Sequence, residues 1–254
     1  MFAKIRYLGI FPCSLDRHAI IDGMDVEVDG ILVAAHELKA PIAVMRQLAL
    51  GLSDLDDRNE HMRSQMVEVS ERAIRQVNDL LKIRKLSEGL FEMEPVAVRA
   101  VCDDVTRELQ CLFEHNRREL CVKYASRARL VTANRELLHS IIYNFLLNAM
   151  HYSGDGMPAE LTVRESRDKV KVEVRDYGPA LPTDVWREMK RGFVSKPISV
   201  AMRPGSSGLG LYIASNFSRY MNAAVGAVRH RDGTSFYVEL PISKQASLFY
   251  DHGD

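Results

Sequence analysis

The chain has 254 residues, with 34 basic and 34 acidic side chains, so its formal net charge is zero. Its length allows one large or two ordinary domains, and its 46% hydrophobic and 27% charged residues are typical of a folded globular protein. The balanced charge argues against a general nucleic-acid or membrane-surface binder, because both classes need an excess of basic side chains. The four cysteines form no Cys-x-x-Cys pair, which favours free thiols in a reducing compartment and predicts a cytoplasmic protein.

The N-terminus shows no secretory signal, and residues 1–21 show no sustained period, so we treat them as an extension of unknown role. The longest run without a charged residue, 137–154, is about as long as a membrane span. It contains two asparagines and two histidines, which are costly in lipid. We therefore expect a buried helix with a polar face, and no transmembrane segment.

Two amphipathic helical stripes lie between residues 22 and 88. Apolar side chains recur at steps of three and four, first at Ile31, Ala35, Leu38, Ile42, Met45, Ala49 and Leu52, and then at Met62, Met66, Val69, Ala73, Val77 and Leu80. A turn-like stretch at 53–57 separates them. The pattern predicts an antiparallel helical hairpin, and because a lone hairpin buries its stripes poorly, we expect a dimer that forms a four-helix bundle.

After Gly89, strands and helices interleave without regular βαβ units, which predicts an α+β layer. We expect strands at 91–95, 119–125, 160–164, 169–175, 224–230 and 235–240, and helices from Pro95 to about His115, from Asn134 to about Ser153, and from Gly208 to Met221. The predicted domains are an N-terminal extension (1–21), a helical hairpin (22–88), an α+β domain (89–245) and a C-terminal tail (246–254).

His36 is the first candidate for chemistry. It lies two residues before Leu38, about 200° around a helix, so its side chain faces away from the apolar stripe. Glu37 is its neighbour, and a carboxylate that holds one ring N–H leaves the other ring nitrogen free to attack. Pro41 removes a helical hydrogen bond and should bend the helix just past the histidine. The alternative is a solvated surface histidine beside a surface glutamate.

Asp176 ends a predicted strand in which it shares its parity with Val170, Val172 and Val174. Its carboxylate should therefore point toward the core. A buried carboxylate needs hydrogen-bond donors, and an adenine amino group is one candidate. Gly178 then breaks the strand and lets a ligand approach the backbone. Alternatively, the aspartate only caps its own turn.

One face of the predicted helix at 134–153 carries the polar side chains Asn144, Asn148, His151 and Tyr152. Amide oxygens suit a hard cation such as Mg²⁺, which also relies on substrate phosphates as ligands. The alternative is a plain solvated helix face.

A glycine-rich segment at 205–210 precedes the last predicted helix and ends in Gly208, Leu209 and Gly210. Free backbone N–H groups at a helix start bind phosphate well, although a simple glycine-rich turn is the commoner explanation. The segment matches neither the P-loop nor the Rossmann pattern. Residues 195–203 before it include Lys196 and show no period, which is typical of a loop beside a binding site.

Together, these segments resemble the motifs of the sensor histidine kinases of bacterial two-component systems. The resemblance covers roughly residues 22–243 and rests on an H-box (His36-Glu37-Leu38-Lys39-Ala40-Pro41), an N-box (Asn144 to Tyr152), a G1-box (Asp176-Tyr177-Gly178-Pro179-Ala180) and a G2-box (Gly208-Leu209-Gly210-Leu211). It implies a dimerisation and phosphotransfer hairpin followed by a two-layer α/β sandwich that binds ATP, as in histidine kinases and chaperone ATPases.

The resemblance also implies the activity and the role of each residue. The protein would use ATP and Mg²⁺ to phosphorylate His36, with Glu37 as general base, and pass the phosphoryl group to an aspartate of a response regulator. Asp176 would bind the adenine amine, Asn148 would hold Mg²⁺, and Asn144 would lie by the phosphates. Other nucleotide contacts would come from His151, Tyr152, Gly178, Lys196, Gly208, Leu209 and Gly210.

Departures from the family pattern are informative. His151 stands where lysine is usual, Ala180 replaces the second glycine of the G1-box, and Asn134 replaces a common aspartate, so a lower ATP affinity is expected. Ala40 stands where the family has a threonine or asparagine that positions water for dephosphorylation, which predicts a kinase-biased enzyme.

Two alternative functions remain open. They are an ATPase of the wider chaperone and mismatch-repair fold without phosphotransfer, and a catalytically dead dimeric scaffold. The stimulus would come from a partner such as a separate sensor or input protein, from residues 1–21, or from a longer native arrangement.

Overall fold

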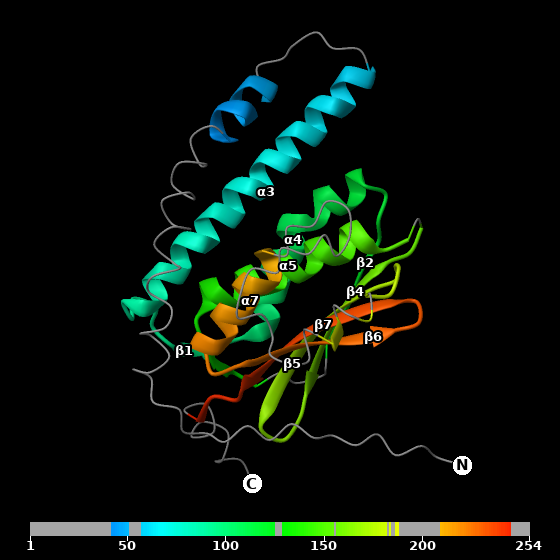
Figure 1. The fold of residues 1–254 in the computed structure, drawn as a ribbon. Coiled ribbons are helices and arrows are strands. Elements are labelled where there is room, and N and C mark those ends of the chain that lie inside the picture. The colour runs from blue at the N-terminus through cyan, green and yellow to red at the C-terminus, as the bar shows by residue number, and fades with distance from the viewer. Residues whose placement is uncertain are drawn as a thin grey trace, which may run out of the picture. The chain divides into compact units, whose positions relative to one another are not determined.

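The structure is a computed structural model that describes residues 42–50, 57–124, 129–154, 156–181, 183, 186–187 and 209–244. The chain divides into two compact units, 1–87 and 88–254, which we describe separately (Figure 1). No helix within these described stretches is long and apolar enough to cross a membrane.

The first unit contains a helical segment at 42–50 and the long helix α3 (Asp57–Ser87). They are joined by Arg46, whose Nε and Nη2 donate to the same Glu71 oxygen at 3.0 and 2.8 Å. Each predicted stripe is buried only in part, because Ala49 and Val77 are buried whereas other members are about half exposed or more, namely Met45, Met62, Met66 and Val69. The described residues therefore leave an apolar surface on both helices.

The second unit is built on a five-stranded sheet with the order β2-β4-β5-β7-β6. Its strands are β2 (Leu120–Tyr124), β4 (Ala159–Glu165), β5 (Lys169–Asp176), β6 (Ala224–His230) and β7 (Gly233–Pro241). β2 runs parallel to β4, and the other neighbours are antiparallel. The β6–β7 hairpin turns at Asp232-Gly233 as predicted, and Gly233 has a φ of 142°, which suits glycine.

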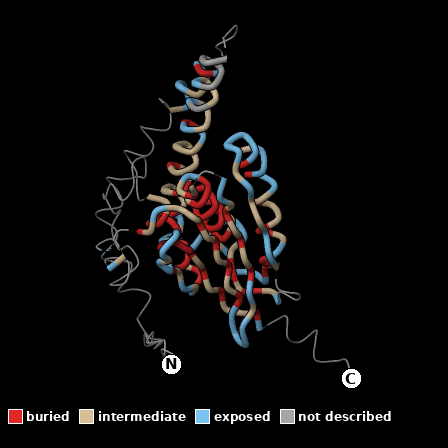
Figure 2. Tube along the Cα trace, turned by 90° about the vertical axis from the view of Figure 1, so that its right-hand side faces the viewer, coloured by how far each residue is buried: buried red, intermediate tan, exposed pale blue. Residues whose placement is uncertain are grey.

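Three helices cover one face of this sheet: α4 (Val98–His115), α5 (Arg135–Tyr152) and α7 (Leu209–Tyr220) (Figure 1). Buried residues concentrate where the helices meet the sheet (Figure 2). The predicted two-layer sandwich is confirmed. The middle helix α5 packs on both α4 and α7, so it is buried on more sides than its sequence pattern indicated, and Tyr143, Leu146 and Leu147 also lie in the core.

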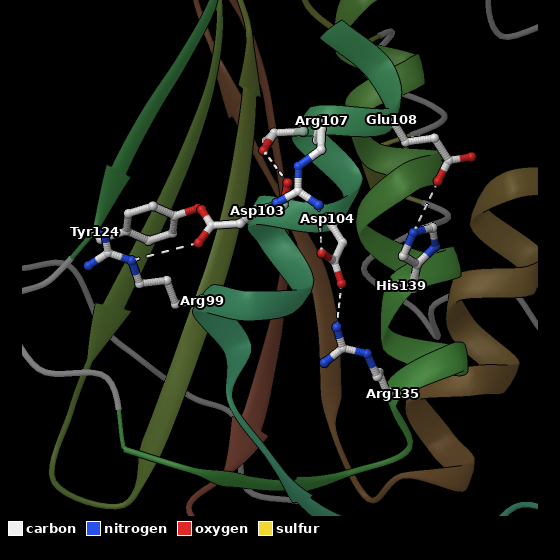
Figure 3. Close-up of polar contacts among 9 residues, drawn as sticks. Arg99, Asp103, Asp104, Arg107, Glu108, Tyr124, Arg135 and His139 are labelled. Carbon is white, nitrogen blue, oxygen red and sulfur yellow. Dashed lines mark hydrogen bonds and ion pairs between the residues drawn. The ribbon is translucent and has the colours of Figure 1, made fainter.

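Charged contacts hold the outer side of α4 to its neighbours (Figure 3). Tyr124 of β2 donates its hydroxyl to Asp103 at 2.5 Å, and the Arg99 guanidinium lies 4.6 Å from the centre of the tyrosine ring. Burial, followed by this hydrogen bond, raises the pKa of Tyr124 above its usual range, so the phenol stays a donor. On the side of α4 that faces α5, Asp104 forms ion pairs with Arg107 and Arg135, and a Glu108 carboxylate oxygen lies 3.1 Å from the Nε2 of His139.

A second, two-stranded sheet was not predicted in full. β1 (Glu94–Val96) pairs antiparallel with β3 (Val131–Ala133), and the sequence analysis expected no strand at 131–133. Three residues are too few to show an alternating pattern. Val131 and Ala133 are nevertheless fully buried, so the strand is set by packing rather than by local sequence.

The described cysteines are free thiols, as expected, and Cys13 lies outside the described residues. Burial, with a smaller contribution from Asp103, raises the pKa of Cys102 to about 12, so this thiol is unreactive in the folded protein.

Asn134 caps α5, as predicted, and also holds a second segment. Its Oδ1 accepts from the backbone N–H groups of Glu136 and Leu137, both at 3.1 Å, while its Nδ2 donates to the Glu92 carbonyl at 3.0 Å. Beside it, the hydroxyl of Tyr220, the last residue of α7, donates to the Phe91 carbonyl at 2.9 Å. Residues 91–92 are thus attached to both α5 and α7.

We predict that Asn134→Asp and Asn134→Ala separate these two functions of the side chain. Aspartate keeps the capping oxygen and adds a favourable charge at the helix start, so the free energy of unfolding should stay near wild type. Alanine removes the cap and should cost about 1 kcal/mol. Urea denaturation followed by circular dichroism measures both values, and an aspartate variant as unstable as the alanine variant would show that the contact with Glu92 dominates.

Candidate functional site

Asp176 is the last residue of β5 and its carboxylate is buried on the helix side of the sheet, with 1% exposure, as its parity predicted. Its Oδ1 accepts from the backbone N–H of Thr234 at 3.1 Å and of Gly178 at 3.3 Å. The second of these bonds is the turn cap that the sequence allows as the alternative role of this aspartate. The first, however, comes from the neighbouring strand β7, so the carboxylate does more than close its own turn.

Thr234 belongs to the same site and was missed by the sequence analysis. It lies opposite Asp176 in the β5–β7 register, and its hydroxyl Oγ1 is fully buried without a hydrogen-bond partner among the described residues. A buried hydroxyl without a partner is costly, so such groups usually serve a ligand or a water. The sequence did contain a sign that Thr234 is buried: it shares its parity along the strand with Phe236, Val238 and Leu240, all of which are buried.

The loop after Asp176 packs tightly against the end of α5. Gly154 donates its backbone N–H to the Tyr177 carbonyl at 2.9 Å, and Tyr177 donates its own N–H to the Ser153 hydroxyl at 3.3 Å. A Cβ on Gly178 would lie 1.7 Å from the carbonyl oxygen of Tyr152. The sequence predicts that this glycine lets a ligand approach the backbone, but in the structure the backbone at the end of α5 occupies the space that a side chain would need.

We therefore predict that Gly178→Ala destabilises the second unit. The new methyl group meets a backbone oxygen that cannot rotate away, so the expected loss is about 1–3 kcal/mol or more. Gly154→Ala is the matched control, because its Cβ would lie 3.3 Å from the Tyr177 oxygen and needs only a small shift. Thermal unfolding of the two variants should show a clearly larger drop for Gly178→Ala, and equal drops would contradict the predicted clash.

The polar residues of α5 differ in their surroundings. Asn144 is buried, which excludes a plain solvated face at this position, and its Nδ2 donates to the Ser140 carbonyl at 2.9 Å. Its Oδ1 faces the start of α7, since a Cβ on Gly210 would lie 3.2 Å from that oxygen. Asn148 and Tyr152 are half-buried, and His151 is exposed.

The structure thus brings together several of the predicted site residues from three elements. α5 provides Asn144 and the end of the helix, the strand β5 provides Asp176 and leads to Gly178, and α7 begins with Leu209 and Gly210. The remaining predicted site residues, His36, Glu37, Lys196 and Gly208, lie outside the described residues, as does Ala40.

Two titratable groups near this end of the sheet have shifted pKa values. Burial, and then a hydrogen bond to Glu160, raise the pKa of Tyr177, whose ring is also covered by the Arg175 guanidinium at 4.4 Å. Burial and the charge of Arg175 lower the pKa of His230. Within the described stretches, no group of three or more His, Cys, Asp or Glu side chains could hold a metal ion, so a cation here would depend on amide oxygens and ligand phosphates.

The arrangement fits a nucleotide. A buried carboxylate beside a buried hydroxyl without a partner offers polar recognition of a base, and an amide oxygen lies against the glycine start of a helix, where phosphate binds well. Residues 133–244 match the model of the histidine kinase-, DNA gyrase B- and HSP90-like ATPases. Over these residues the chain is similar to the ATPase domain of that family. The domain contains every described residue of the site.

Relatives that match most of the chain point in the same direction and confirm the predicted relationship to sensor histidine kinases. The chain is 26% identical over 213 residues to the probable sensor histidine kinase TcrY of Mycobacterium tuberculosis, covering 82% of this chain and 44% of that protein. It is 27% identical over 232 residues to the alginate biosynthesis sensor protein KinB of Pseudomonas aeruginosa, covering 85% and 37%. The chain therefore spans less than half the length of these relatives.

A similar fold is seen in the crystal structure of full-length ShkA in complex with AMPPNP. The match has a TM-score of 0.60 at 22% identity and covers 85% of this chain and 46% of that one. It supports the fold of the ATPase domain and of the segment before it.

Proposed function

We propose that this protein is an ATP-dependent histidine kinase that phosphorylates itself on His36 and transfers the phosphoryl group to an aspartate of a response regulator. The observation that carries the proposal is the site in the ATPase domain, where the buried Asp176 and Thr234 lie next to the end of α5. The order of the motifs along the chain and the sensor kinases among its relatives support the same function.

The nucleotide is ATP, which is supported by the family of the domain and by the AMPPNP bound to ShkA. The adenine amino group donates to Asp176, and Thr234 supplies a second polar group at the base. Tyr152 lines the nucleotide at the end of α5. The phosphates lie toward Asn144 and the start of α7, with Gly208, Leu209 and Gly210 providing backbone N–H groups and Lys196 a positive charge.

Asn148 is the residue of this chain that would hold Mg²⁺ through its amide oxygen. When bound, Mg²⁺ neutralises phosphate charge during phosphoryl transfer. His151, which is exposed one turn further along α5, stands where the family usually has a lysine, so an imidazole replaces an ammonium group on this side of the phosphates. Positioning and charge neutralisation provide most of the catalysis in reactions of this type.

In the first transfer, a ring nitrogen of His36 forms a bond to the γ-phosphorus while the bond from that phosphorus to the ADP oxygen breaks. Glu37 accepts the proton from the other ring nitrogen and so keeps the attacking nitrogen nucleophilic. In the second transfer, an aspartate oxygen of the response regulator attacks the same phosphorus, and His36 leaves as the neutral imidazole after the proton returns from Glu37.

The helical unit would act as a homodimer and as the surface for the response regulator. This is supported by the exposed Met45, Leu48, Met62, Met66 and Val69, which leave an apolar surface on both described helices. A second copy that completes a four-helix bundle would bury such a surface. Residues 22–88 would form this hairpin and 89–245 the catalytic domain.

We predict that His36→Gln abolishes incorporation of label from ATP while leaving ATP binding unchanged, because the histidine lies outside the ATPase domain. Glu37→Gln should also leave ATP binding unchanged and slow the reaction by about 10²-fold or more, the usual scale for a general base. Labelled ATP with Mg²⁺ and calorimetric binding measure the two properties. Acid-labile, base-stable label that persists on His36→Gln would exclude this histidine as the acceptor, and phosphate release without any labelled protein would favour the ATPase alternative.

We also propose that the enzyme is kinase-biased, because the methyl group of Ala40 can neither donate nor accept a hydrogen bond to an attacking water. Residues one turn apart share a helix face, so Ala40 has the position from which a polar side chain would orient that water beside His36. We predict that wild type accelerates the decay of a phosphorylated response regulator weakly or not at all, and that Ala40→Thr accelerates it more. Decay is followed with Mg²⁺ and ADP, and rapid decay with wild type would contradict the argument.

A further inference from the structure

The loop at 177–181 is attached at both ends by side chains that none of the motifs include. At its start, the Ser153 hydroxyl accepts the backbone N–H of Tyr177 and donates to the Pro158 carbonyl, both at 3.3 Å. At its end, Arg229 donates through Nε to the Leu181 carbonyl at 2.7 Å. Ser153 is the buried C-cap residue of α5, and Arg229 belongs to the edge strand β6, so the two attachments come from different elements of the domain.

The attachment at Ser153 connects two parts of the proposed nucleotide site. Ser153 follows Tyr152 directly, and Tyr177 follows Asp176 directly. A parallel hydrogen bond from the Gly154 N–H to the Tyr177 carbonyl, at 2.9 Å, reinforces the contact. The distance between the end of α5 and the buried carboxylate is therefore set by hydrogen bonds in which the Ser153 side chain takes part.

The attachment at Arg229 comes from the edge strand β6, two strands away from Asp176 in the sheet. In the β6–β7 register Arg229 lies opposite Thr234, and in the β5–β7 register Thr234 lies opposite Asp176. Leu181 itself is buried, and its carbonyl accepts from Arg229 of this sheet. Arg229 thus joins the end of the loop to the strand pair that carries Thr234.

We propose that Ser153 and Arg229 are positioning residues for adenine recognition: they hold the 177–181 loop so that Asp176 and Thr234 are already placed for the base before the nucleotide binds. This inference rests on the proposed ATP site. Holding a recognition group in its bound geometry raises affinity because less order has to be created on binding. Neither residue needs to touch the nucleotide for this effect.

The test compares ATP with inosine triphosphate, in which a carbonyl oxygen replaces the adenine amino group that Asp176 would accept. Dissociation constants of both nucleotides are measured with Mg²⁺ on the full 254-residue chain. Ser153→Ala and Arg229→Gln should each weaken ATP binding by about threefold to tenfold, the scale of one hydrogen bond, and leave inosine triphosphate binding nearly unchanged. The preference for ATP should therefore fall, and the rate of autophosphorylation at saturating ATP should stay at the wild-type value.

The chain offers a matched control for each change. Ser218 is equally buried and donates to the Ser215 carbonyl at 3.0 Å within α7, so Ser218→Ala removes a similar bond that does not reach the loop. Arg129 donates to the backbone carbonyls of residues 166 and 167 at 2.9 and 3.0 Å, beyond the opposite end of β5. Ser218→Ala and Arg129→Gln should keep the wild-type preference for ATP. Ser153→Thr, which keeps the hydroxyl, should restore it.

The outcomes separate this inference from the proposed function. Asp176→Asn is the reference for lost recognition, and if neither wild type nor this variant distinguishes the two nucleotides, the proposed adenine site is wrong. If wild type prefers ATP but Ser153→Ala and Arg229→Gln weaken both nucleotides equally, the two residues support the fold only and the positioning role is overturned. A selective loss of ATP binding, with rescue by Ser153→Thr, establishes the role.

Discussion

A carboxylate buried at the end of a central strand constrains everything around it. Removal of an ionised group from water costs several kcal/mol unless hydrogen-bond donors replace the water, and Asp176 receives backbone donors from Thr234 on one side and Gly178 on the other. Both donors require a close approach of the chain. A Cβ on Gly233 would lie 2.0 Å from the Asp176 carbonyl oxygen, and the Cβ on Gly178 would overlap with α5. The glycines beside the aspartate thus follow from the need to surround one charge with backbone.

Helix α5 serves the core and the site at the same time. Its apolar residues fill the space between the sheet and the neighbouring helices, and yet Asn144 is buried among them. The amide is tolerated because its Nδ2 bonds to a carbonyl one turn earlier in the same helix, so that its Oδ1 can face the start of α7. The approach of α7 in turn depends on Gly210, because a side chain there would press on that oxygen. The close packing of α5 against α7 therefore also places the polar amide of Asn144 in the site.

Features that depend on neighbours along the chain could be predicted from the sequence. The inward direction of Asp176 followed from the alternation of the valines, and the cap at Asn134 followed from its place before a helix. Features that depend on the pairing of distant segments could not. Thr234 becomes part of the site only through the β5–β7 register, and the true neighbour of Gly178 is a carbonyl that lies 26 positions earlier in the chain, at Tyr152. β3 has only three residues, which is too short for an alternating pattern to be recognised in the sequence. His36 lies outside the described residues.

The attachment of residues 91–92 has a practical consequence for anyone who wishes to study the ATPase domain by itself. The matched family segment begins at residue 133, and the sandwich as a set of strands and helices begins with β1 at Glu94. A fragment that started at either point would lack the carbonyls of Phe91 and Glu92, to which Tyr220 and Asn134 donate. It would also lack the Phe91 ring, which packs edge-on against Tyr220 with the ring centres 6.3 Å apart. A fragment that keeps these contacts therefore has to start before Phe91. The boundary between the two compact units, between residues 87 and 88, is a suitable place.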